Sequence, residues 1–74
     1  MLLITRATLT ARLLSDFNTS IFIPPSEVIE TDPDPEDPVW LRVSWRGQRL
    51  HAPRPEVART AVLAARAEAA AAKP

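Results

Sequence analysis

The sequence predicts an α+β fold: a small antiparallel sheet of three to four strands, packed by an alanine-rich carboxy-terminal helix and by a short amino-terminal helix. Three observations lead to this class. Residues 39–46 alternate between apolar and polar side chains, as a strand with one buried face does. Gly47, the single glycine, follows at once and suits the reversal of a hairpin over residues 39–52. Beyond residue 56 the chain is rich in alanine, the strongest helix former.

The turn of the hairpin can be tested by parity. A two-residue loop at 46–47 places Val43 opposite Leu50, so that apolar side chains share one face. A four-residue loop at 46–49 keeps the same faces. A three-residue loop would place Val43 opposite His51 and mix the faces, so it is excluded.

The amino-terminal segment is ambiguous after a short strand over residues 1–5. Leu9, Leu13 and Phe17 recur every four residues, which favours a helix over residues 6–17. The same residues also alternate as a strand would, and their threonines are common in strands. Because the stripe ends in a Ser-Asp pair suited to a turn, helix is the preferred interpretation and strand the alternative.

Prolines divide the middle of the chain. Residues 21–23 form a short strand that stops at two prolines, since proline cannot donate to a strand ladder, and residues 28–29 continue it briefly. Residues 30–38 hold three prolines and five carboxylates. We expect an extended, solvated spacer loop there.

The carboxy-terminal helix begins near Pro55, which suits the first helical turn, and Glu56 complements the helix dipole. Its apolar face runs through Val57, Ala61 and the alanines that follow. Residues 67–74 have little to bury, so a frayed tail is expected.

The chain of 74 residues predicts a single small domain over residues 1–74. A chain this short buries only about 60% of its unfolded surface. The sequence contains no cysteine, so no disulfide adds stability. Association, as a homo-oligomer or on a partner, is the expected further source of stability.

The charges are divided along the chain although they sum to zero. Residues 1–38 carry two arginines and seven carboxylates, a net charge of −5; residues 39–74 carry seven basic side chains and two carboxylates, a net charge of +5. Such polarity can steer a partner, but two halves of one fold that neutralise each other explain it better.

The sequence argues against an enzyme. A single glycine excludes a glycine-rich phosphate loop, and the absence of cysteine excludes a thiol nucleophile. Only His51 could activate a serine, and no serine has the context of a nucleophile elbow. So short a chain also has little room for a pocket of about 300 Å³ or more.

No metal or other cofactor is expected either. His51 has no companions for a zinc site and is best explained as an exposed strand histidine. The acidic residues of the spacer begin with calcium-loop spacing, but Asp37 stands where that loop needs glycine and Val43 where it needs glutamate.

Membrane and secretory segments are not expected, because the apolar residues 1–4 are soon interrupted by Arg6 and Arg12. We therefore expect a cytoplasmic protein without a membrane partner.

The two tryptophans should point to opposite faces of the hairpin. Trp45 falls on the inner face with the core, and Trp40 on the outer face, unless the amino-terminal helix or the spacer covers it. An outward tryptophan beside arginines is typical of an interface anchor. The sequence thus predicts a non-catalytic protein-interaction module that self-associates or docks on a larger protein. The expected interface consists of Trp40, Arg42, Arg49 and His51.

Two other functions remain open. The basic hairpin predicts a small nucleic-acid-binding regulator, with arginine on phosphate; its residues would be Arg42, Arg46, Arg49 and Arg54. An accessory or inhibitor protein of viral or mobile-element type could instead present the acidic spacer to a basic partner.

Overall fold

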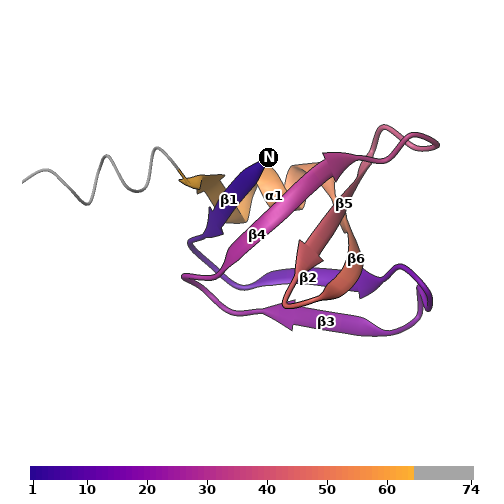
Figure 1. Ribbon diagram of the computed structural model, residues 1–74, viewed down its shortest axis with the longest axis horizontal. Coiled ribbons are helices and arrows are strands. Elements are labelled where there is room, and N and C mark those ends of the chain that lie inside the picture. The colour runs from indigo at the N-terminus through magenta and orange to yellow at the C-terminus, as the bar shows by residue number, and fades with distance from the viewer. Residues whose placement is uncertain (65–74) are drawn as a thin grey trace, which may run out of the picture.

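A computed structural model describes residues 1–64, and all the strands in this range belong to one antiparallel sheet (Figure 1). The strand order across the sheet is β3-β2-β6-β5-β4-β1-β7. The elements are β1 (Leu2–Thr5), β2 (Leu9–Leu13), β3 (Ser20–Ile23), β4 (Val28–Pro33), β5 (Trp40–Trp45), β6 (Gln48–Pro53), α1 (Arg54–Thr60) and β7 (Ala61–Leu63). Within residues 1–64, no helix is long and apolar enough to cross a membrane.

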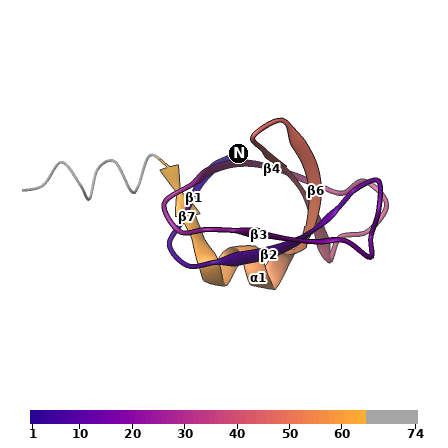
Figure 2. The same cartoon turned by 90° about the horizontal axis from the view of Figure 1, so that it is seen from below.

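The sheet is curled into a half-barrel with α1 beside β2 (Figure 2). The predicted α+β class, with three to four strands packed by a helix, is therefore wrong. The described residues form seven strands and one short helix. Three segments expected to be helix or loop are strands instead, and each gains a hydrogen-bonded neighbour in the sheet.

The first of these segments is β2, where the preferred helix over residues 6–17 is wrong and the alternative strand is right. Leu9 and Ala11 are buried and Thr10 between them is exposed, which is the period of a strand. β2 lies between β3 and β6, so pairing on both sides decides a segment whose own pattern allowed both structures.

The second segment is β4, which takes the first residues of the predicted spacer. Glu30 to Pro33 pair with β5, so the prediction of a loop over residues 30–38 is wrong for this part. Ile29 and Thr31 point inward and are buried, while the carboxylates of Glu30 and Asp32 alternate with them and point to solvent. The first proline of the segment stands at the end of the strand, so none interrupts it.

The third segment is β7, where the predicted helix is cut short. Pro55 and Glu56 lie in the first turn of α1 as predicted, but the helix ends at Thr60 and Ala61 is extended. Residues 61–63 pair with β1, and these ladder bonds outweigh the helix propensity of alanine. The predicted frayed tail, residues 67–74, lies outside the described residues.

The predicted strands at 1–5 and 21–23 and the 39–52 hairpin are confirmed. The hairpin has the two-residue loop, with Val43 opposite Leu50 and Arg42 opposite His51. Arg46 and Gly47 both have positive φ, 48° and 76°, as a type I′ turn requires.

The core lies inside the curl of the sheet. The fully buried apolar side chains come from five strands, and Val57 of α1 closes the space between β2 and β6. They include Leu9, Ile23, Ile29, Val43 and Leu50. Burial of these side chains removes their apolar surface from water, which stabilises the fold by about 25 cal/mol per Å².

Candidate functional site

Three rings meet on the outer face of the hairpin. The Trp40 ring lies 5.0 Å from that of Phe17, edge-on, and 5.8 Å from the imidazole of His51. These ring separations are those of favourable aromatic pairs. Phe17 is 48% exposed, so the cluster is open to solvent on that side. Phe17 was expected in a helix stripe and not here, because only the fold of the β2–β3 loop brings it to Trp40.

The β2–β3 loop holds Phe17 in place through its own polar groups. Asp16 accepts hydrogen bonds from the backbone N–H of Asn18, at 3.1 Å, and from the hydroxyl of Thr19, at 2.7 Å. The hydrogen bond from Thr19, and to a smaller extent the one from Asn18, lowers the pKa of the Asp16 carboxyl. Arg12 donates to the carbonyl oxygen of Phe17 and its guanidinium lies 5.2 Å from the centre of the Phe17 ring. The loop is thus a built turn that fixes an aromatic side chain on the surface.

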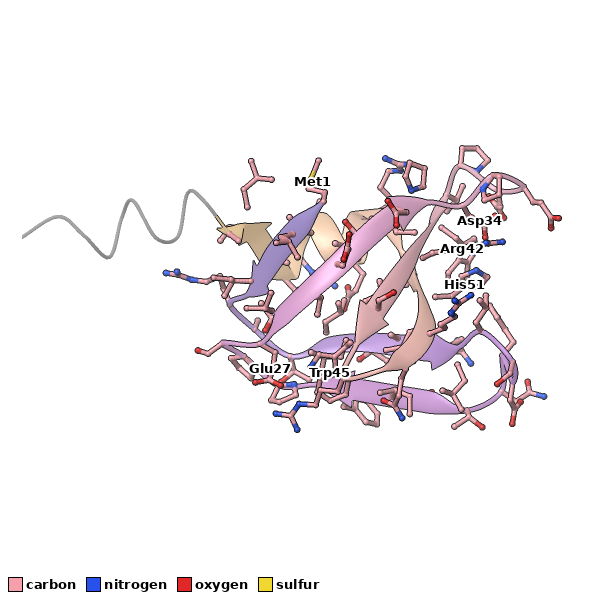
Figure 3. The ribbon with its side chains drawn as sticks, viewed as in Figure 1. Met1, Glu27, Asp34, Arg42, Trp45 and His51 are labelled. Carbon is pink, nitrogen blue, oxygen red and sulfur yellow. The ribbon has the colours of Figure 1, made fainter. Side chains whose placement is uncertain are left out.

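His51, the third ring of this cluster, also lies against Asp34 (Figure 3). Its Nε2 is 2.9 Å from Asp34 Oδ2, although the two are not aligned as a hydrogen bond. The prediction of an exposed strand histidine is wrong, because only 17% of the His51 side chain and 7% of that of Asp34 are exposed.

The pKa of Asp34 is lowered, chiefly because the backbone N–H of Glu36 donates to Oδ1 at 2.8 Å. Burial opposes this effect, and the neighbouring Arg42 and His51 side chains reinforce it. The carboxylate therefore supports both the start of the β4–β5 loop and the imidazole.

The sheet register places the four predicted interface residues in three successive rows of the outer face, the first of which holds Trp40. Arg12, His51 and Arg42 lie side by side across β2, β6 and β5. Arg49 is in the next row, opposite Ser44. The structure thus brings His51 and Trp40 together with Arg42 alongside, while Arg49 lines a separate depression of about 320 Å³ that Asp32 and Arg42 share.

Trp40 also forms one wall of a groove. The ladder between β2 and β6 begins at Arg12 and Leu13, and Thr10 and Pro53, which precede and follow it on these strands, line the groove. The groove has a volume of about 350 Å³ and lies between β2, β6 and the first turns of α1. Its lining, called the Trp40 groove below, is Thr10, Arg12, Trp40, Pro53, Pro55, Glu56 and Arg59.

The arginines of the nucleic-acid prediction are dispersed. Arg46 lies at the hairpin turn, where its guanidinium is 2.6 Å from Glu27 and 5.0 Å from the centre of the Trp45 ring. Arg54 begins α1 and donates to the carbonyl oxygen of Pro38. In Figure 3, Trp45 and Glu27 lie at the opposite end of the sheet from Arg42 and His51. Pairs such as Arg46 with Glu27 support neutralisation within the fold.

Trp45 belongs to the core side of the hairpin, as predicted. It is partly buried against the core, and its indole N–H donates to Glu27 Oε1 at 3.0 Å. The two tryptophans therefore have different roles: Trp45 closes the core, and Trp40 forms a surface.

A larger apolar hollow lies between β1, β5, α1 and β7, with a volume of about 570 Å³. The expectation that so short a chain has little room for a pocket of about 300 Å³ or more is wrong, because the curled sheet and α1 surround a hollow of this size. Leu3, Leu41 and Val57 form its floor, and Arg54 lies at its rim.

Among residues 1–64, no group of three or more His, Asp or Glu side chains is placed to hold a metal ion. The chemistry available on the outer face is instead an indole, a phenyl ring and guanidinium groups, which suit binding to another molecule. Comparisons of the chain with protein-family models, with curated proteins and with solved structures give no match.

Proposed function

We propose that the protein is a non-catalytic interaction module that binds a protein partner through the Trp40 groove. The observation that carries the proposal is that a half-buried tryptophan lines an open groove while Phe17 and His51 hold its ring. Tryptophan and arginine are the residues that contribute most to binding in protein interfaces.

The contacts around Trp40 reduce the entropy that binding would cost. Phe17 packs edge-on against the indole, and Phe17 is itself held by Arg12. A side chain already fixed in position loses little freedom when a partner arrives, so more of the contact energy appears as affinity.

The groove also suggests the chemistry of the partner. Pro53 and Pro55 provide apolar walls beside the indole, and Arg12 provides a positive charge at one side. Within residues 1–64, Arg59 forms an ion pair with Glu56, whereas Arg12 contacts a backbone carbonyl and forms no ion pair. Arg12 is therefore the positive charge of the groove that a partner can neutralise. We infer a partner that presents an apolar side chain next to a carboxylate.

The test compares Trp40→Ala with Leu2→Ala. Leu2 is an exposed apolar residue on β1, away from the groove, and serves as the matched control. Partners retained from an extract of the source cells would be identified and purified, and their affinities measured by calorimetry. We expect Trp40→Ala to weaken binding by about 30-fold, the effect of a hot-spot tryptophan worth about 2 kcal/mol, and Leu2→Ala to leave it unchanged.

The proposal fails if Trp40→Ala remains folded and keeps every association of the unmodified protein. Circular dichroism of both variants would establish that the fold is intact.

Nucleic-acid binding is supported less, because Glu27 neutralises Arg46 and Asp32 lies beside Arg42. A labelled single-stranded oligonucleotide titrated at low salt would separate the two functions: affinity that falls steeply with added salt would favour nucleic acid. Presentation of the acidic loop is also supported less. Asp34 and Asp37 accept hydrogen bonds from the backbone N–H groups of Glu36 and Val39, so they support the loop itself.

A further inference from the structure

The backbone edge of β3 is open. Among the described strands, β3 and β7 lie at the two ends of the sheet order, and β2 is the one neighbour of β3 (Figure 1). Edge strands are commonly protected by a charged side chain or a bulge that prevents further pairing. Ser20–Ile23 contains no charged residue and pairs with β2 in continuous register without a bulge, so this edge has neither protection.

The hydrogen-bond pattern shows which backbone groups face outward. The N–H of Leu13 donates to the carbonyl of Thr19 at 3.1 Å. Bonded and non-bonded pairs alternate along an antiparallel ladder, so Ile21 and Ile23 exchange bonds with β2. The N–H and C=O groups of Ser20 and Phe22 therefore point away from β2, toward the open side.

The side chains of β3 are also incompletely covered. Phe22 is 64% exposed on the outer face. Ile21 faces inward and packs against the core, but it is only partly buried. Another strand that continued the sheet past β3 would remove apolar surface of both residues from water.

We propose that β3 pairs with β3 of a second copy in antiparallel fashion, about a two-fold axis at Ile21. In this register Ser20 lies opposite Phe22 of the second copy, and each such pair can exchange both of its N–H···O bonds. A register centred one residue later would bring Pro24, which has no N–H, into a bonded position. The strand is thus complementary to itself in the register that its free backbone groups require.

This pairing is separate from the proposed function and does not use the Trp40 ring. The two-fold axis would place the outer faces of both copies on the same side of one continuous sheet. Two Trp40 grooves would then face the same direction.

The test measures molar mass by light scattering over a range of concentrations, with the full chain. We expect the mass to rise from 8.2 kDa toward twice that value. Phe22→Pro removes the outward donor and leaves the bonds to β2, and Phe22→Lys adds a charge to the edge. Each should weaken dimerisation by about 100-fold, because each change acts twice across the axis. Two controls should leave dimerisation unchanged. One is Val28→Lys, a matched change at an exposed residue of the internal strand β4, and the other is Trp40→Ala.

Amide hydrogen exchange of the unmodified protein provides a readout that does not depend on a variant folding. The amides of Ser20 and Phe22 should become protected as the dimer forms. A monomer at every concentration, or a dimer in which these two amides exchange freely, would overturn the proposal.

Discussion

Thr5 offers a sharp test of how the sheet is held together. Its side chain is fully buried, and its hydroxyl donates to the carbonyl of Pro24 at 2.7 Å and accepts from the N–H of Glu27 at 2.9 Å. The hydroxyl therefore ties the end of β1 to the β3–β4 connection. Thr5→Val keeps the volume of the side chain and removes both bonds.

The expected loss follows from these two contacts. Each net hydrogen bond contributes about 1 kcal/mol, and the partners left behind are only part-buried, so water can reach them. We expect Thr5→Val to lower the free energy of unfolding by about 2 kcal/mol. For a chain of this length the total is about 4–11 kcal/mol. The melting temperature should fall by about 8–16 °C.

The assay is urea unfolding followed by tryptophan fluorescence, with Thr5→Ser as the control. Serine keeps the hydroxyl and removes one methyl group, at a cost of about 1 kcal/mol. A Thr5→Val protein as stable as the unmodified protein would refute the reasoning, since the bonds would then contribute nothing.

Three further predictions concern the turn, the acidic loop and the Glu27 contacts. Gly47→Ala should lower the free energy of unfolding by about 1–2 kcal/mol, because φ is +76° although no atom lies within 4 Å of an added Cβ; an unchanged urea midpoint would contradict this. The lowered pKa of Asp34 means that its contribution to stability is present above the unfolded pKa of about 4 and is lost as the pH falls through the folded value. Asp34→Asn should therefore lose less stability than the unmodified protein between neutral pH and pH of about 2, and parallel melting curves would argue against it. Glu27→Ala should lower the free energy of unfolding by about 1 kcal/mol and shift the Trp45 fluorescence to the red, whereas Glu27→Gln, which can still accept from the indole N–H, should not shift it.

Part of the candidate site could be predicted from sequence because it depends on one hairpin. Alternation and a single glycine fix which residues of 39–52 share a face, so Trp40 and His51 had to lie on the outer side. Phe17 and Asp34 come from separate loops. Nothing local in their sequence indicates that they pack on the hairpin, and only the curl of the sheet brings them there.

The same distinction applies to the fold. By itself, the sequence determined the features that arise from near neighbours: the strand at 1–5, the strand at 21–23 that stops at proline, the two-residue turn and the inward position of Trp45. The tertiary structure alone decided the segments at 9–13, 30–33 and 61–63. Their patterns or propensities favoured helix or loop, but each is extended because a neighbouring strand supplies hydrogen bonds to its backbone and buries its inward side chains.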